Sequence, residues 1–411
     1  MKFLPIACVC IMLSITSIGQ EKAKKVLFII ADGIAADVIE RVSKPNIDKI
    51  IEAGSYKRAF VGGIKGTYSQ TPTISAPGYN NLLTGTWANK HQVLNNTISK
   101  PNYQYWTIFR YLKNAYPNKK TAVFSTWTDN RTKLIGDGLA ETGGYKIDMA
   151  FDGYELDTLR FVHDKKSNYI HQIDELVVSK ADSTIRASAP DLSWVYLEYT
   201  DDMGHQFGDG AMQDQAIGYL DNQIKKLTDA IAYRTKNFAE DWLIVLTTDH
   251  GRDAIAGKNH GGQTDRERTT WIVTNQANTN DYFKQSNPAI VDVLPSIVAF
   301  LKIPILEKNK EELDGVSFFG PVSIAQPTAA IVNDSLVIKW KSFEKKGKVQ
   351  VKIATTNAFK DGGEDVYQNI ATVNVTQEGI TLSTKQFAAN YFKIVLVGAN
   401  NTLNIWVKKP A

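Results

Sequence analysis

Cysteine is almost absent from this chain of 411 residues, and it occurs only as Cys8 and Cys10, within an apolar N-terminal stretch. A disulfide framework and thiol catalysis are therefore excluded for the rest of the chain. The net charge is only +4, which gives no indication of a nucleic acid or an anionic membrane as partner. Beyond the N-terminal stretch, no apolar run is long enough for a membrane-spanning helix.

The N-terminal stretch is typical of a secretory signal peptide. Lys2 supplies a positive charge, residues 3–18 are almost wholly apolar, and Ser17 and Gly19 are small residues at the positions expected before a cleavage point. We predict a signal peptide over residues 1–19 and hence an exported protein, periplasmic or secreted. A membrane anchor is disfavoured because the apolar run is shorter than about 20 residues and polar, charged residues follow it directly.

Two parts of the chain differ in their hydrophobic pattern. Across residues 22–322, short apolar runs alternate with longer segments of helical spacing, which predicts an α/β domain with a mostly parallel sheet sandwiched by helices. Across residues 326–411, short alternating stretches are separated by turns, which predicts a small all-β sandwich domain. The apolar runs of the first part are Val26–Ile30, Trp194–Leu197, Trp242–Leu246 and Trp271–Val273.

Acidic residues follow three of these apolar runs. Asp32 follows the first, Asp201 and His205 follow the second, and Asp249 and His250 follow the third. Ligands bind at the carboxyl ends of the strands in open α/β sheets, and a buried group of carboxylates is costly without a cation. A single aspartate after a strand is most often a helix cap, but the whole set predicts a metal site.

Histidine is scarce, with six residues in all, so its placement is informative. His205 and His250 follow apolar runs, and His260 lies in a glycine-flanked loop shortly afterwards. Mixed histidine and aspartate ligation favours zinc over magnesium or calcium. Five or six such ligands exceed the needs of one tetrahedral ion and suit a pair of ions that acts on both oxygens of a phosphoryl transfer. His163 and His171 lie among polar residues, and we expect them at the surface.

A candidate nucleophile lies in Thr71–Tyr79, ahead of an apolar segment. Pro77 favours the first turn of a helix, which would place Ser75 at a helix N-terminus, where an anion such as a phosphoryl group is stabilised. A metal ion on the Ser75 oxygen would lower its pKa and make an alkoxide. The alternative is that Ser75 or Thr73 only caps the helix.

These motifs resemble those of the alkaline phosphatase superfamily, most closely its type I phosphodiesterase/nucleotide pyrophosphatase branch. The resemblance covers residues 25–320 and implies that Ser75 is the nucleophile, that Asn96 holds a phosphoryl oxygen, and that each chain binds two Zn²⁺. By this resemblance one zinc takes Asp201, His205 and His260. The other takes Asp32, Asp249, His250 and the Ser75 oxygen. The motifs that carry the resemblance are Thr73–Gly78, Leu83–Gly85, His91, Asn95–Asn96, Asp201–His205, Asp249–Gly251 and His260.

The resemblance further implies hydrolysis of phosphodiester or nucleotide pyrophosphate bonds through a covalent phosphoserine. Small phosphate esters or nucleotides would be the substrates, and we expect the amide of Ala76 to assist Asn96 with the non-bridging oxygens. The chain departs from the branch pattern in having serine for threonine at position 75, and Gly78 and Tyr79 for Asn-His. A sulfatase is disfavoured because the arginine of its signature is missing and its metal ligands are all oxygen.

The choice between diester and monoester depends on the segment Ser125–Arg131. Trp127 suits a wall for the extra group of a diester, whereas Arg131, or Lys133 nearby, suits the dianion of a monoester. An exported phosphate monoesterase is therefore the alternative, and a metal-binding protein without activity is a more distant one. The C-terminal part resembles a fibronectin type III or immunoglobulin-like module by its strand pattern.

Overall fold

The computed structural model describes residues 21–409, so the predicted signal peptide lies outside the described part. Its centre is a seven-stranded sheet in the order β2-β7-β6-β1-β5-β3-β4. β7 runs antiparallel to its neighbours β6 and β2, and the other neighbouring strands are parallel. The strands are β1 (Ala23–Ala31), β2 (Ser55–Phe60), β3 (Thr121–Ser125), β4 (Met149–Phe151), β5 (Leu192–Leu197), β6 (Glu240–Thr247) and β7 (Thr269–Thr274).

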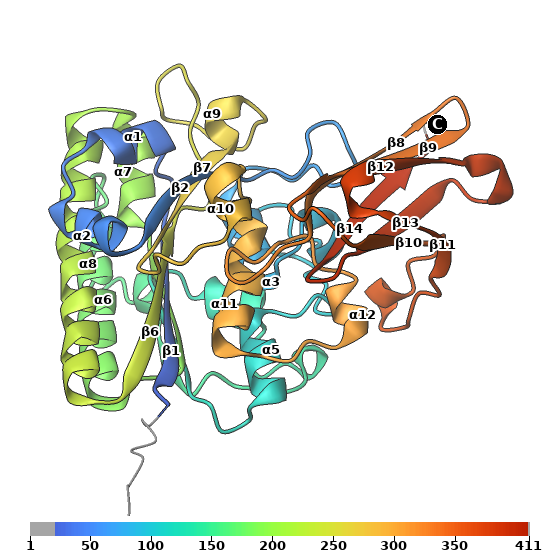
Figure 1. Cartoon of the computed structure of the whole chain (residues 1–411). Helices are drawn as coiled ribbons and strands as arrows, with labels where there is room; N and C mark the ends of the chain where they lie inside the picture. The colour runs from blue at the N-terminus through green and yellow to red at the C-terminus, as the bar shows by residue number, and fades with distance from the viewer. Residues whose placement is uncertain (1–20, 410–411) are drawn as a thin grey trace, which may run out of the picture.

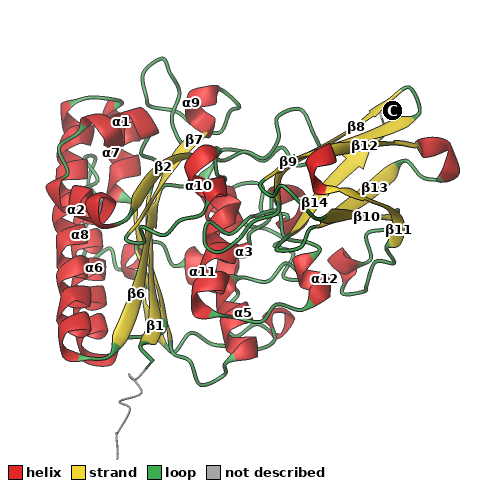
Figure 2. Cartoon of the chain, in the orientation of Figure 1, coloured by secondary structure: helices red, strands yellow, loops and turns green. Residues whose placement is uncertain are grey.

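Helices cover both faces of this sheet, as Figures 1 and 2 show. Successive side chains of β1 alternate between the faces, so Phe28 joins one hydrophobic cluster while Leu27 and Ile29 join the other. Burial on both faces explains why the strands appear in the sequence as continuous apolar runs. The helices of one face are α1 (Ala36–Arg41), α2 (Pro45–Ala53), α6 (Asn168–Ser188), α7 (Tyr199–Phe207) and α8 (Ala211–Asn237), and those of the other are α3 (Ser75–Thr84), α5 (Ile108–Ala115), α10 (Asp281–Gln285) and α11 (Val293–Leu301).

The strand order decides where the functional residues meet. β6, β1 and β5 are adjacent and parallel, so their carboxyl ends lie at the same edge of the sheet. Each of these three strands is one of the apolar runs that an acidic residue follows in the sequence. Short helices complete this part of the chain, namely α4 (Ala88–His91), α9 (Asp265–Arg268) and α12 (Glu307–Lys310). No helix within residues 21–409 is long and apolar enough to cross a membrane.

The C-terminal part contains two antiparallel sheets, β12-β9-β8 and β11-β10-β13-β14. Ile338 of one sheet and Val351 and Ile394 of the other belong to a common hydrophobic cluster, so the two sheets pack as a sandwich. The fold class predicted from the sequence is confirmed for both parts. The strands are β8 (Ile324–Val332), β9 (Ser335–Ser342), β10 (Lys348–Ala354), β11 (Gln368–Asn374), β12 (Gly379–Ser383), β13 (Tyr391–Val397) and β14 (Thr402–Lys408).

Candidate active site

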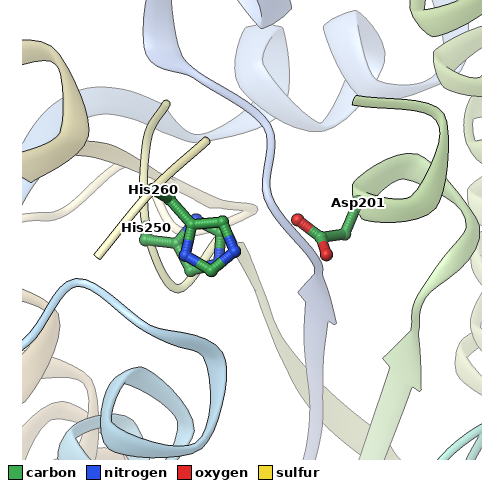
Figure 3. A group of neighbouring side chains, drawn as sticks. All are labelled: Asp201, His250 and His260. Carbon is green, nitrogen blue, oxygen red and sulfur yellow. The ribbon is translucent and has the colours of Figure 1, made fainter. Parts of the chain in front are cut away.

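The predicted metal ligands lie together at the carboxyl ends of β6, β1 and β5. Asp32 follows β1, Asp249 and His250 follow β6, and α7 carries Asp201 and His205 directly after β5. The loop with His260 returns to the same edge, where its ring stacks on His250 with the centroids 3.7 Å apart. In Figure 3 the carboxylate of Asp201 points toward these two rings.

One group of ligand atoms surrounds Nε2 of His250. This nitrogen lies 3.5 Å from Oδ1 of Asp32, 3.3 Å from Oδ2 of Asp249 and 3.5 Å from Oγ of Ser75. The other ring nitrogen, Nδ1, is 2.9 Å from the carbonyl oxygen of Gly251, which fixes it as the donor and leaves Nε2 free to bind a metal. Ligands about 2.0–2.1 Å from a tetrahedral zinc ion lie about 3.3–3.4 Å from one another, so these spacings suit one ion.

A second group surrounds Nε2 of His205. It lies 3.2 Å from Oδ2 of Asp201 and 3.1 Å from Nε2 of His260. Nδ1 of His260 is 3.0 Å from the carbonyl oxygen of Thr73, so its Nε2 is also left for a ligand role. The ligand atoms of Asp201, His250 and His260 all lie within 4.8 Å of one another, so His250 lies between the two groups.

The three carboxylates show that the residues fit metal ions. One oxygen of each is engaged by the protein: Asp249 accepts from the Gly33 N–H at 3.2 Å, Asp32 accepts from Tyr196 at 2.7 Å, and Asp201 accepts from Arg252. The opposite oxygens of Asp32 and Asp249 are buried without a hydrogen-bond partner in residues 21–409. Buried unpaired carboxylate oxygens are costly, and bound cations would satisfy them.

Electrostatics support the same conclusion. Burial raises the pKa of Asp32 well above its ordinary value, with repulsion from Asp249 and Asp201 adding to the effect, and burial raises the pKa of Asp249 to about 7. Burial would also raise the pKa of Asp201, but Arg252 and a hydrogen bond from His205 hold it below its ordinary value. Burial lowers the pKa of His250, so this ring is neutral, as a metal ligand must be.

Ser75 is the first residue of α3, and its side chain faces the first group of ligands. Oδ1 of Asn96 accepts from the Ala76 N–H at 3.0 Å. This amide, which we expected to bind a phosphoryl oxygen, is therefore already engaged, and Nδ2 of Asn96 is the donor that the side chain offers beside Ser75. Gly78 allows the close approach of α3, because a Cβ there would lie 2.9 Å from Cβ of Asp249.

Trp127, Arg131 and Lys133, which the sequence suggested as substrate contacts, are packed against or paired with other parts of the protein. Trp127 is partly buried, and its ring centroid lies 6.3 Å from that of Tyr79. Arg131 is paired with Asp152 at 2.6 Å and with Asp137 at 2.7 Å. Lys133 is paired with Asp129 at 2.7 Å. Both cations predicted as phosphate contacts are thus engaged by nearby carboxylates.

Arg252 is a residue of this site that sequence reasoning missed. Its side chain is fully buried, donates to the carbonyl oxygens of Gly33 and Asp201 at 2.7 Å each, and also binds the Asp201 carboxylate. Gly204 makes room for it, since a Cβ there would lie 2.2 Å from the guanidinium carbon. Its position directly after Asp249–Gly251 was the available signal. Tyr79 and Tyr196, whose hydroxyls reach Asp32, were missed as well.

Comparison with known proteins assigns this chain to a protein family. The model of the type I phosphodiesterase/nucleotide pyrophosphatase family matches residues 26–288, more than half of the chain. Among solved structures, a 2-O GAG sulfatase has a TM-score of 0.51 at 11% identity, covering 89% of this chain and 86% of that one, which shows a shared fold. An inactive variant of murine ectonucleotide pyrophosphatase/phosphodiesterase 5 in complex with AMP has a TM-score of 0.48 at 15% identity, covering 69% and 96%. A phosphonate monoester hydrolase of Agrobacterium radiobacter has a TM-score of 0.48 at 12% identity, covering 94% and 89%. By its family match, this chain belongs to the type I phosphodiesterase/nucleotide pyrophosphatase family of hydrolases.

Proposed function

We propose that this chain hydrolyses phosphodiester or nucleotide pyrophosphate bonds through a covalent phosphoserine on Ser75, at a site that binds two zinc ions. The observation that carries the proposal is the position of Oγ of Ser75, 3.5 Å from Nε2 of His250 and at the N-terminus of α3. The mixture of histidine and aspartate ligands supports zinc. Bound ions would lower the pKa of the Ser75 hydroxyl and stabilise charge on the leaving oxygen.

The residues of the chain account for the rest of the reaction. The Ser75 hydroxyl gives up its proton to solvent as its oxygen forms a bond to phosphorus. The bond from phosphorus to the leaving oxygen breaks, and the leaving group takes up a proton from solvent. Water then attacks the phosphoserine from the vacated side and loses a proton, while the bond from phosphorus to the Ser75 oxygen breaks and that oxygen takes up a proton, which restores the serine. The positive end of the α3 dipole and Nδ2 of Asn96 stabilise the non-bridging oxygens.

Two features favour a diester over a monoester as substrate. A monoester carries two negative charges and usually meets a free arginine or lysine, but Arg131 and Lys133 are each paired with carboxylates. Trp127 is partly buried, its ring centroid lies 6.3 Å from that of Tyr79, and we assign it as the apolar wall against which the second group of a diester would pack. The alternative, an exported phosphate monoesterase, requires Arg131 or Lys133 to leave its acidic partners.

A paired assay separates these possibilities. We expect the purified, zinc-loaded protein to show a higher kcat/KM for bis-p-nitrophenyl phosphate than for p-nitrophenyl phosphate, with two zinc ions counted per chain. A preference for the monoester would establish the phosphatase alternative. Two bound ions without turnover of either ester would indicate a metal-binding protein without this activity.

Replacement of the nucleophile tests the covalent step. Ser75→Ala removes the attacking oxygen but none of the histidine or aspartate ligands, so we expect kcat to fall by about four powers of ten or more. Zinc content, measured by atomic absorption, should stay at the wild-type value. Ser183→Ala, on an exposed position of α6, is the matched control and should keep full activity. Substantial turnover by Ser75→Ala would refute the assignment.

The location of the protein and its division into two domains are part of the same proposal. The signal peptide predicted for residues 1–19 supports an exported enzyme, periplasmic or secreted, that acts on small phosphate esters or nucleotides. The change from the central sheet to antiparallel sheets supports a catalytic domain over residues 22–322 and a separate sandwich domain over residues 326–411.

A further inference from the structure

Two tyrosines converge on one oxygen of Asp32. Oδ2 of Asp32 accepts a hydrogen bond from the hydroxyl of Tyr79 and, at 2.7 Å, from the hydroxyl of Tyr196. The two hydroxyl oxygens are 2.8 Å apart. All three residues are buried, and Oδ1 of Asp32 has no hydrogen-bond partner within the described chain. The protein therefore holds Oδ2 of Asp32 by hydrogen bonds and leaves Oδ1 free to bind a metal ion.

The free oxygen is the one directed at the metal ligands. Oδ1 of Asp32 lies 3.5 Å from Nε2 of His250, which in turn lies 3.5 Å from Oγ of Ser75. We propose that Tyr79 and Tyr196 are positioning residues that make Asp32 a one-oxygen metal ligand and thereby set the metal affinity of the group beside Ser75. This inference rests on the proposed metal-dependent function.

The two hydroxyls are held in place by independent elements. Tyr79 is four residues after Ser75 on α3, so one face of one helix carries both the nucleophile and a donor to Asp32. Tyr196 lies on β5 in register with Ile30 of β1, the strand that directly precedes Asp32. The two rings meet at 60° with their centroids 4.9 Å apart. The two rings are therefore buried, packed against each other and anchored on a helix and a central strand.

The arrangement has a physical consequence for coordination. A carboxylate without these partners can rotate or bind an ion through both oxygens, whereas a carboxylate with Oδ2 occupied presents a single lone-pair direction. Hydrogen bonds to the non-coordinating atom of a ligand typically change metal affinity by about 10–100-fold. The same hydrogen bonds stabilise the charged form of the Asp32 carboxylate. They thereby offset part of the cost of placing three aspartates in one buried site.

The experiment removes only the hydroxyl oxygens. Tyr79→Phe and Tyr196→Phe keep the rings and their packing, and we expect each to bind one of the two zinc ions about 10–100-fold more weakly in competition with a chromogenic chelator. Tyr282→Phe is the matched control, because Tyr282 is buried and donates to the Asp292 carboxylate at 2.7 Å outside the site. It should bind both ions with wild-type affinity.

Cobalt substitution gives a readout that is independent of activity. The visible absorption bands of Co²⁺ report coordination, and we expect Tyr79→Phe and Tyr196→Phe to alter them while Tyr282→Phe does not. Excess zinc should restore much of the activity of the two site variants, since a weakened ligand responds to zinc whereas a misfolded site does not.

The outcomes separate this inference from the proposed function. Wild-type zinc affinity and cobalt spectra in both site variants would overturn the positioning role and leave the enzyme assignment intact. Weakened binding in a protein that turns over no phosphate ester would support the positioning role and refute the enzyme assignment. A wild-type protein that binds no zinc would refute both.

Discussion

At the scale of single residues, Arg252 brings a full positive charge to a metal site. Its guanidinium is buried and binds the carboxylate of Asp201, the carbonyl oxygen of Gly33 and, at 3.2 Å, that of Lys258. It therefore ties together the segment after β1, the helix α7 and the loop that leads to His260. A buried cation here offsets part of the negative charge of the three aspartates in the candidate metal site.

Replacement of this arginine should destabilise the protein in a zinc-dependent way. Arg252→Met leaves Asp201 as a buried charge without its partner, which we expect to cost about 3–5 kcal/mol in the metal-free protein. Zinc supplies another counter-charge to Asp201, so the loss should be smaller in the zinc-loaded protein. Urea denaturation with zinc and with EDTA measures the difference. Arg234→Met breaks the buried pair with Glu240 far from the metal ligands, and its loss should be equal in both conditions. An equal loss for Arg252→Met would contradict the role that we assign to it.

At the scale of elements, the fit of α3 against the end of β6 controls the position of Ser75. Gly78→Ala adds a methyl group 2.9 Å from both Cβ and the carbonyl oxygen of Asp249, so the helix must move outward. Because near-attack geometry is lost by displacements of about 1 Å, we expect kcat to fall by about 100-fold or more. Gly218→Ala on α8 is the matched control, since apart from the adjacent residues and the backbone of α8 itself no atom of the described chain lies within 4 Å of the added carbon. Steady-state kinetics and thermal unfolding of both variants check this, and an unchanged kcat in Gly78→Ala would count against it.

The sequence predicted the strands that are continuous apolar runs, because such runs are typical of strands buried on both faces. β1, β5 and β6 are apolar runs that end in acidic residues, so both the strands and their functional ends could be recognised. β2 could not, because its sequence Ser55–Phe60 is largely polar and lies at the edge of the sheet. The contacts of Tyr79 and Arg252 could not be recognised either, although Arg252 directly follows Asp249–Gly251. Their partners Asp32 and Asp201 are about 50 residues away in sequence, and only the folded chain brings them together.

At the scale of the whole molecule, the buried acids couple stability to pH. Asp32 and Asp249 have raised pKa values in the folded protein, to about 7 for Asp249, because of their burial. In the unfolded chain an aspartate ionises near about 3.9, so between these values the folded state holds more protons than the unfolded state. The free energy of unfolding of the metal-free protein should therefore fall as the pH rises from about 4 to about 7.

We expect zinc to reverse this dependence, because an ion bound at the candidate site would displace the protons and bind more tightly as the pH rises. We expect the difference in Tm between zinc-loaded and EDTA-treated protein to widen steadily from pH 5 to pH 8. Asp249→Asn removes one of the titrating groups and should flatten the profile of the EDTA-treated protein. A difference in Tm that narrows with rising pH would contradict this account.

The C-terminal sandwich is joined to the central sheet domain by buried charges. Lys393 of β13 is fully buried, binds Glu312, and binds Asp365 at 2.7 Å. Lys90 of α4 is also buried, and it donates to Asp314 at 2.6 Å and to Asn404 of β14 at 2.9 Å. Figure 1 shows the sandwich beside α12 and on the opposite side of the central sheet from α6 and α8. Because α4 precedes Asn96 in the chain, the sandwich contacts the segment that leads to the side chain proposed to bind a phosphoryl oxygen.

Lys393→Met tests how firmly this interface is held. The substitution leaves Glu312 and Asp365 without a counter-charge, and we expect a loss of about 3–5 kcal/mol in the free energy of unfolding, measured by urea denaturation. Lys352→Met is the matched control, because Lys352 pairs with Glu311 at 3.0 Å across the same interface but stays partly exposed to solvent. Its loss should be within about 1 kcal/mol. Equal losses in the two variants would mean that burial of the Lys393 pair does not set the strength of the contact. The expected inequality would show that this buried pair strengthens the contact between the sandwich and the part of the chain that carries the central sheet.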